Sequence, residues 1–402
     1  MNFNSFDLNP VLLENIEALG YETPTPIQKD SITPIIEGKD VMGLAATGSG
    51  KTAAFCLPML ERLLLGPRRV VRAVIVAPTR ELAQQIHEAI EGFAKGTRLR
   101  SITLYGGVNI NPQIKALAHG VEIVVACPGR LLDHIQQRTI NLSKAEVLVL
   151  DEADQMFDMG FLPDIRTILR FMPKDRQTLL FSATMPAAIN TLANDVLRNP
   201  IKVEAGHSTP PASVSQALFP VPKHLKTALL MHILQQINKE SVLVFTRTKH
   251  TAKKVAQKLE DAGFSATSLQ GNLSQNKRQA AMRGFRDGSL QILVATDIAS
   301  RGIDVSSVSH VINYDIPSTV EAYIHRIGRT GRAAKEGEAF TLITQEDSAE
   351  VRAIERVLGK KIPQQEAEGF NYNVAAPART LGSAATPRRP QQRRRNTSKD
   401  RN

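Results

Sequence analysis

Short apolar runs recur along the chain and are separated by longer segments with helical periodicity. The runs hardly alternate between apolar and polar positions and are rich in β-branched residues, which is typical of strands buried on both faces of a parallel sheet. They lie at 41–44, 73–77, 121–126, 147–150, 178–181, 242–245, 292–295 and 311–314. Between them apolar residues return every three or four positions, as in Leu82, Ile86 and Ile90. This alternation predicts an α/β fold with parallel sheets covered by helices on both faces.

The alternation breaks between residues 206 and 222, where four prolines fall within seventeen residues. Proline cannot donate a hydrogen bond to a central strand and interrupts a helix, so the break predicts a domain boundary. After about residue 370 the periodicity ends, and such a segment buries too little apolar surface to offset its ordering entropy. We therefore expect an N-terminal domain at 1–205, a linker at 206–213, a second domain at 214–366 and a disordered basic tail at 367–402.

The net charge is unevenly distributed. Of the total of +11, residues 377–402 carry eight Lys or Arg and one Asp, or +7, which leaves +4 for the preceding 376 residues. A basic tail favours a polyanionic partner such as nucleic acid, and a solubilising tail is the alternative. The only cysteines are Cys56 and Cys127, which excludes a disulfide framework and fits a reducing compartment. Without a signal-peptide pattern or an apolar run of about 18 residues, we expect a cytoplasmic protein that binds no membrane.

The strongest local signal is the segment Ala45-Ala-Thr-Gly-Ser-Gly-Lys-Thr52, which follows a predicted strand. It resembles a Walker A loop with Ala45 in place of the first glycine. Gly48 and Gly50 would let backbone N–H groups approach phosphate oxygens, Lys51 would neutralise the β- and γ-phosphates, and Thr52 would hold Mg²⁺. An ordinary Gly-rich turn is the alternative, but a strand before and a helix after favour the phosphate loop. The predicted ATP-binding residues here are Ala45, Ala46, Thr47, Gly48, Ser49, Gly50, Lys51 and Thr52.

Three carboxylates follow the predicted strand 147–150, in Asp151-Glu-Ala-Asp154. Left alone they would repel one another, and a divalent cation removes that difficulty. Asp151 is positioned to hold Mg²⁺, and Glu152 to orient and deprotonate the attacking water. A solvated acidic turn is the alternative, and the presence of the phosphate loop disfavours it.

These residues resemble the DEAD-box ATP-dependent RNA helicases of superfamily 2, in particular compact bacterial RhlE-type proteins. The resemblance covers about residues 3 to 345 and implies two tandem RecA-like P-loop domains. It also assigns Gln28 to the adenine edge, Tyr21 to the base, and Phe3 to the isolated aromatic upstream. Asp154, Ser182, Thr184 and His325 would couple hydrolysis to unwinding, although His325 reads equally well as a structural histidine, and Asp304 would face ATP. RNA contacts would come from Pro78, Thr79, Arg80, Gly106, Gly107, Pro128, Gly129, Arg130, Thr246, Arg247, Gln270, Gly271, Thr296 and Arg301. Cys127, Gln270 and Asn272 depart from the commoner family residues.

The predicted apparatus is divided between the domains. The first has the phosphate loop, metal ligand and base but no obvious arginine for the transition state, whereas the second has no phosphate loop but offers Arg329 and Arg332. An arginine finger contributes about 10³ to 10⁵ in rate, so hydrolysis should wait for the domains to close. The alternative for these arginines is a solvated helix face, which two interior glycines disfavour.

Several functions remain open from the residues. The first is an RNA helicase that opens short duplexes with little sequence readout, because the proposed contacts are glycine backbones and arginines suited to phosphate. An ATP-gated RNA clamp without unwinding is a second function, and a DNA helicase a third. A GTPase is disfavoured because no Asn-Lys-x-Asp segment occurs. We expect ATP and Mg²⁺ as cofactors, a monomer, and ribosomal precursors or an RNA-decay complex as partners.

Overall fold

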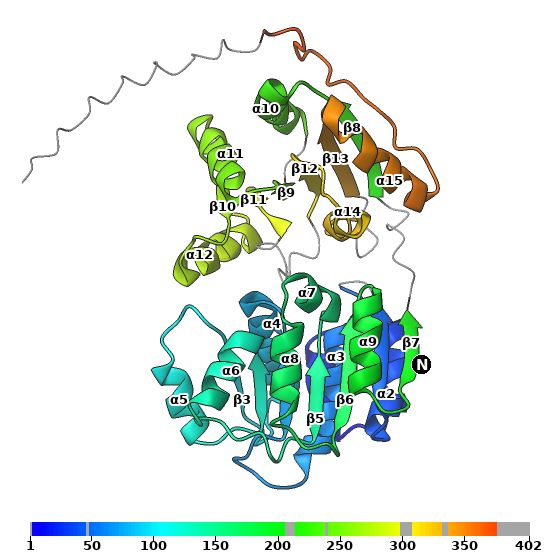
Figure 1. The fold of residues 1–402 in the computed structure, drawn as a ribbon, viewed down its shortest axis with the longest axis vertical. Coiled ribbons are helices and arrows are strands. Elements are labelled where there is room, and N and C mark those ends of the chain that lie inside the picture. Colours follow the sequence, from blue (N-terminus) through cyan, green and yellow to red (C-terminus); the bar gives the residue numbers. More distant parts are fainter. Residues whose placement is uncertain are drawn as a thin grey trace, which may run out of the picture.

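The computed structural model describes residues 2–45, 48–205, 214–237, 240–297, 308–331 and 337–375, which build two α/β domains (Figure 1). The first has a seven-stranded sheet in the order β3-β4-β2-β5-β6-β1-β7, and the second a six-stranded sheet in the order β10-β11-β9-β12-β13-β8. Every strand pair in both sheets is parallel. The predicted fold class, two RecA-like parallel-sheet domains, is thereby confirmed.

The strands of the first sheet are β1 (Val41–Ala45), β2 (Ala73–Val76), β3 (Ser101–Leu104), β4 (Ile123–Ala126), β5 (Val147–Leu150), β6 (Gln177–Ser182) and β7 (Ile201–Ala205). Its helices are η1 (Phe3–Ser5), α1 (Pro10–Ala18), α2 (Pro26–Ile36), α3 (Lys51–Leu64), α4 (Arg80–Phe93), α5 (Asn111–Ala118), α6 (Pro128–Gln136), α7 (Ala153–Asp158), α8 (Leu162–Leu169) and α9 (Ala187–Val196).

The strands of the second sheet are β8 (Val214–Pro220), β9 (Val242–Phe245), β10 (Ala266–Leu269), β11 (Ile292–Ala295), β12 (His310–Asn313) and β13 (Gly337–Ile343). Its helices are η2 (Lys223–Leu225), α10 (Lys226–Gln236), α11 (Lys249–Asp261), α12 (Gln275–Arg286), α14 (Val320–Ile327), η3 (Gln345–Asp347) and α15 (Ser348–Leu358).

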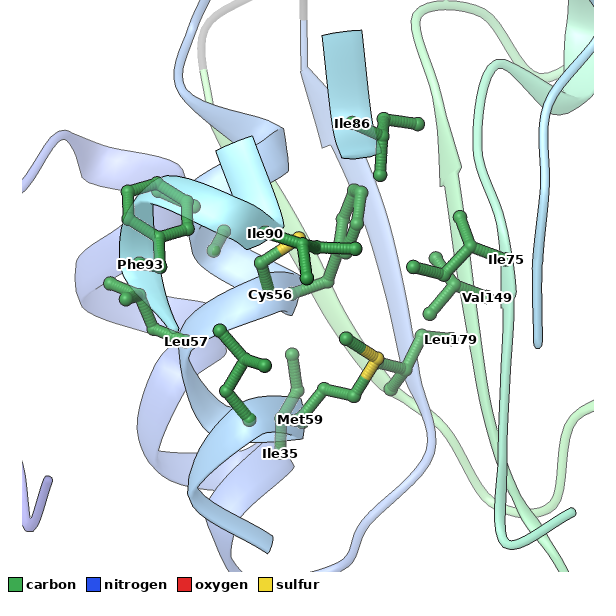
Figure 2. Close-up of a cluster of buried hydrophobic side chains, with 14 of the residues drawn as sticks. Ile35, Cys56, Leu57, Met59, Ile75, Ile86, Ile90, Phe93, Val149 and Leu179 are labelled. Carbon is green, nitrogen blue, oxygen red and sulfur yellow. The ribbon is translucent and has the colours of Figure 1, made fainter. Parts of the chain in front are cut away.

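Each sheet has an apolar layer on both faces, as its uninterrupted strands require. In the first domain, Ile75, Val149 and Leu179 project from the central strands towards Met59 of α3 and Ile86 of α4 (Figure 2). A separate cluster covers the opposite face, and the second sheet has the same two-sided arrangement. This burial holds the strands rigidly, so the loops at their carboxyl ends have fixed positions.

The C-terminal end of the second domain differs from the predicted boundary at residue 366. Pro363 and Gln365 exchange backbone hydrogen bonds with Leu218 of β8, and Ala367 is buried. Phe370 and Tyr372 then pack against the cluster on the α10 side. Residues 367–375 therefore belong to the packed domain. The predicted linker at 206–213 and the rest of the tail, 376–402, lie outside the described residues.

Candidate ATP site and RNA interface

The phosphate loop connects β1 to the start of α3. Gly48 and Gly50 adopt φ values of +82° and +92°, the left-handed region in which only glycine is free of strain. A Cβ at Gly50 would also lie 2.5 Å from the Nε2 atom of Gln28. Lys51 is buried, and its Nζ atom donates to the Ala45 carbonyl over 2.7 Å. The turn is thus built for close approach of a ligand to the backbone and the lysine.

Gln28 closes one side of this loop. Its Nε2 atom donates to the Gly50 carbonyl over 3.1 Å, and its Oε1 atom accepts from the Thr25 amide over 2.9 Å. The side chain is therefore held against the phosphate loop at the start of α2. Tyr21 is partly exposed, and its ring packs edge-on against Phe3 and Phe93. The adenine contacts predicted for Gln28, Tyr21 and Phe3 stay predictions.

The three carboxylates after β5 are almost completely buried. Burial raises the pKa of Asp151, and Lys51 opposes the rise. Burial, and next the Asp151 carboxylate, raise the pKa of Glu152 to about 7. Glu152 has φ +53°, which strains a non-glycine residue and is typical of functional positions. Its Oε2 atom and the Ser49 hydroxyl are buried without a hydrogen-bond partner among the described residues, so both are available to a ligand.

These observations fit Mg²⁺ bound together with a nucleotide. Among the described residues, no group of three or more His, Cys, Asp or Glu side chains could hold a metal ion alone. Mg²⁺ is usually held by one or two carboxylates together with substrate phosphates and water. Asp151, within electrostatic reach of Lys51 at the phosphate loop, and Thr52, the next residue, would provide that incomplete set, so both remain the candidate ligands.

Asp154 joins β5 to the end of β6. Its backbone amide donates to the Ser182 hydroxyl over 3.2 Å, and its Oδ2 atom accepts from the amide and the hydroxyl of Thr184, each over 2.9 Å. Ser182 in turn donates to the Thr184 carbonyl. A shift of Asp154 would therefore move both residues, and the coupling role predicted for the three stays a prediction.

The second domain brings α14 and the turn after it to this cluster. Arg329 is buried, and its charge lowers the pKa of Glu152 against the larger effect of burial. Gln155 of α7 and His325 line a small cavity together with Arg329. The predicted base and the predicted arginine finger, from different domains, therefore lie within electrostatic reach of each other.

Arg326 has a structural environment that the sequence did not predict. Its guanidinium makes a two-pronged ion pair with Asp297 at 2.6 and 2.7 Å, and it also donates to the Asn313 side chain. The guanidinium lies 4.9 Å from the centre of the Phe245 ring. Arg326 thus ties together the ends of β9, β11 and β12.

The predicted RNA residues that the structure describes lie at the carboxyl ends of β2, β3, β4, β9, β10 and β11, the edge where α/β sheets bind ligands. A Cβ on Gly106, Gly129 or Gly271 would meet no atom within 4 Å, so these backbones are open to a ligand. Thr246 is fully buried, and its amide donates to the Ala295 carbonyl over 2.9 Å, so its RNA contact stays a prediction. The Arg130 guanidinium is held by Gln113, Val108 and Asp133.

Other RNA-side residues shape this edge locally. Thr79 caps α4 by accepting from the Leu82 amide, and Pro78 precedes it. Pro128 is the first residue of α6, and its N-cap, Cys127, makes no side-chain capping hydrogen bond. Burial raises the pKa of Cys127 to about 12, so a neutral thiol stands at this position. Gln270 accepts from the Asn272 amide, and Thr296 follows β11.

Ala46, Thr47, Arg301, Asp304 and Arg332, which were also predicted as site residues, lie outside the described residues.

A contact between the two domains was missed entirely by the sequence reasoning. The Nε atom of Arg278 on α12 donates to Glu81 on α4 over 2.8 Å, and the two side chains are only 10% and 12% exposed. Beside this pair, the predicted RNA residue Arg80 donates to Gln275 over 3.2 Å. Both helices line a groove of about 480 Å³. No local pattern links residues 197 positions apart, so only the fold could reveal the pair.

Two parallel sheets with one phosphate loop between them, an acidic cluster and an opposing arginine define a P-loop ATPase whose site is completed across two RecA-like domains. The DEAD/DEAH box helicase model matches residues 25–192, and the helicase conserved C-terminal domain model matches residues 225–334. The DEAD-box ATP-dependent RNA helicase CshA of Bacillus cereus is 43% identical over 367 residues, covering 91% of this chain and 70% of that protein. CshA of Bacillus subtilis is 42% identical over 90% of this chain and 73% of its own length. The chain belongs to the DEAD-box ATP-dependent RNA helicases and is an ATP-binding, RNA-dependent ATPase.

Solved structures add information on the domain arrangement. Dbp5 of S. cerevisiae bound to RNA and ADP BeF3 has a TM-score of 0.83 at 30% identity, covering 91% of this chain and 96% of that one. Mss116p bound to ssRNA and AMP-PNP has a TM-score of 0.82 at 29% identity, covering 90% and 78%. A DEAD box protein of Methanococcus jannaschii is more similar in sequence, at 40% identity, yet has a TM-score of 0.53 over 91% and 99%. Sequence divergence therefore does not explain the difference between these TM-scores. Because the two high scores cover both domains, the domains of this chain are arranged as in the RNA- and nucleotide-bound relatives.

Proposed function

We propose that this helicase clamps RNA without reading its sequence and opens short duplexes when ATP draws its two domains together. The placement of Arg329 beside Glu152 carries the proposal, because each domain then holds only part of the hydrolytic apparatus. Lys51 would hold the phosphates, and Glu152 would accept the proton of the attacking water. Arg329 would stabilise the charge that develops on the departing phosphoryl group. Arg332 is the second arginine candidate.

Mg²⁺, held by Thr52 and Asp151, would neutralise charge on the β- and γ-phosphates. The protein groups supply the rest of the chemistry: the phosphate loop orients the nucleotide, and Glu152 holds the water in line. Asp154 would transmit the state of this site to Ser182 and Thr184. On the second domain, His325, beside Gln155, would provide the corresponding link.

RNA binding would rest on phosphate contacts. Dbp5 and Mss116p were solved with RNA, and the domains of this chain are arranged as theirs are. The open backbones at Gly106, Gly129 and Gly271 suit phosphate oxygens, as do Gly107 beside the Arg80 guanidinium and Arg247 at the end of β9. Affinity should therefore fall steeply with salt and depend little on sequence. Closure on one strand would bend it and expel its partner, since unstacking a step costs only about a few kcal/mol.

An Arg329→Ala variant tests the shared site. RNA-stimulated ATP turnover should fall by about 10³-fold or more if the arginine acts as a finger, while ATP binding measured by a fluorescent analogue stays within about threefold. A variant that keeps its full turnover rate would refute the divided site. Strand displacement on a short duplex separates a helicase from the second candidate, an ATP-gated clamp, which would bind RNA without releasing a strand.

The cellular setting is a further proposal. We keep ribosome assembly and RNA decay as its two candidates, with a monomer acting in the cytoplasm. No helix in the described part of the chain is long and apolar enough to cross a membrane. The narrower resemblance to RhlE-type proteins stays a prediction, because the relatives compared above are CshA helicases. Crosslinking RNA in cells and sequencing it would yield ribosomal precursors in the first setting and messenger fragments in the second.

A further inference from the structure

The two sheets have the same strand order once they are matched strand by strand. The order β3-β4-β2-β5-β6-β1 in the first domain corresponds to β10-β11-β9-β12-β13-β8 in the second. In this correspondence β8 takes the place of β1, the strand before the phosphate loop. Helix α10 then takes the place of α3, and β12 takes the place of β5, which precedes the acidic cluster.

Lys226 and Thr227 occupy the positions of the phosphate-loop residues Lys51 and Thr52. β1 ends at Ala45, and α3 begins six residues later at Lys51; β8 ends at Pro220, and α10 begins six residues later at Lys226. Both lysines are almost completely buried, with 6% and 5% of each residue exposed. The segment 221–225 contains no glycine, so its backbone cannot form the same phosphate-binding turn.

Carboxylates of the protein surround the Lys226 ammonium. Its Nζ atom donates to the Tyr314 carbonyl over 2.9 Å and lies 3.6 Å from an oxygen of Asp315 and 4.0 Å from one of Asp347. Thr227 shares a hydrogen bond with the Tyr314 hydroxyl. Burial lowers the pKa of Lys226, and Asp315 is the largest influence that opposes it. A buried ammonium needs such partners, because an uncompensated buried charge is strongly destabilising.

Asp315 connects this lysine to two other regions. Its Oδ2 atom accepts from the Arg247 amide over 2.9 Å, which fixes the turn after β9. Its own carbonyl accepts from Arg326 over 2.7 Å. The Arg247 guanidinium donates to the neighbouring Ile316 carbonyl. The lysine, the RNA-side turn and the buried arginine of α14 therefore meet at one residue.

We propose that Lys226, the second domain's counterpart of the phosphate-loop lysine, is a positioning residue for RNA binding that holds Asp315 and, through it, the Arg247 turn. The inference rests on the proposed RNA contact of Arg247. Without the ammonium, Asp315 and Asp347 would face each other with no cation between them, and Asp315 would turn towards water. The Arg247 amide would lose its acceptor, and the guanidinium its fixed direction.

The Lys226→Met variant of the full chain tests this, since it keeps the side-chain length and removes the charge. Lys223→Met, at an exposed lysine of the same loop, is the matched control. We expect the RNA concentration for half-maximal ATPase stimulation to rise about tenfold in Lys226→Met, the loss of roughly one charge-assisted hydrogen bond. The turnover rate at saturating RNA and the KM for ATP should stay unchanged. Faster hydrogen exchange at the Arg247 amide should accompany the change.

The proposal is overturned if the RNA concentration for half-maximal ATPase stimulation does not change. A lower turnover rate at an unchanged half-maximal RNA concentration also overturns it, because that pattern marks a loss of folded protein only. If Lys226→Met does not fold, Asp315→Asn breaks the same ion pair with little change of shape and must weaken RNA stimulation in the same way. If RNA fails to stimulate the wild-type chain, the proposed function falls, whereas exchange at Arg247 still tests the link to Lys226.

Discussion

The Glu81–Arg278 ion pair should control how readily the two domains close. Its partners come from α4 of the first domain and α12 of the second, and their side chains are 12% and 10% exposed. The pair therefore exists only while the domains are together. Neutral, similarly shaped variants at the two positions, Glu81→Gln and Arg278→Gln, remove the charges singly or together.

The magnitude follows from the burial of the pair. Exposed ion pairs contribute about 0 to 1 kcal/mol, whereas truncating one partner of a buried, hydrogen-bonded pair costs about 2 to 5 kcal/mol. The remaining exposure favours the lower end, about 2 kcal/mol, which is roughly a 30-fold shift towards the open arrangement. The double variant should recover part of this loss, because neither charge is then left alone in the interface.

Domain closure can be measured by fluorescence energy transfer between a dye on each domain, at fixed RNA and ATP-analogue concentrations. RNA-stimulated ATPase activity measured in parallel should fall with the closed population. Arg286→Gln is the control, because Arg286 is exposed on the same helix and lines the same groove. Single variants that close as readily as the wild type, or losses that simply add in the double variant, would refute the reasoning.

Further predictions concern Glu152, Gly107 and Asp297. Glu152→Gln should abolish turnover while retaining bound ATP. In the nucleotide-free wild type, the raised pKa of Glu152 means that the folded state keeps a proton which the unfolded state releases, so its contribution to stability falls between about pH 4.5 and 7. Urea unfolding of wild type and Glu152→Gln at several pH values checks the sign, since the variant should lose that part of the slope. Gly107→Ala should weaken RNA binding several-fold without changing ATP affinity, because a Cβ there meets the Arg80 guanidinium and φ is +77°; titrations of wild type and variant with RNA and with an ATP analogue test it. Asp297→Asn should lower the free energy of unfolding by about 1 to 3 kcal/mol by weakening the ion pair of the buried Arg326, measured by urea denaturation.

The predicted strands that proved right are those buried on both faces. The runs at 73–77, 147–150, 242–245 and 292–295 match β2, β5, β9 and β11 within one residue. A short continuous apolar run is typical of a strand that is buried on both faces. The edge strands β3, β7, β8 and β10 were not predicted, and neither was the inner strand β13. β3 and β7 carry exposed or half-exposed residues over most of their length, so their apolar content alone is too small to mark them.

The site was predictable where its chemistry is contiguous in the chain. The phosphate loop and the acidic cluster are short segments whose spacing is set by one ligand, and both lie at strand ends as expected. The ion pairs of Arg278 and Arg326 depend on which strands become neighbours, which local periodicity does not encode. The packing of residues 367–375 against the second domain was not predicted for a related reason. Their few apolar residues pack on a surface of α10 that exists only in the folded domain.

The divided arrangement has an electrostatic cause. Asp151, Glu152 and Asp154 are buried beside one cation, Lys51, in the first domain, so that domain alone holds more negative than positive charge at the point where ATP brings still more. Mg²⁺ and an arginine from the other domain would supply the missing positive charge, and a bound phosphate would add to the attraction that Arg329 already has for Glu152. The attraction that draws Arg329 towards the site is therefore strongest when nucleotide is present. Lys226, at the matching position of the second domain, already has its carboxylates within the fold. One domain thus requires its ligand for charge balance while the other achieves that balance internally, and this asymmetry is the physical ground on which we propose that nucleotide promotes closure.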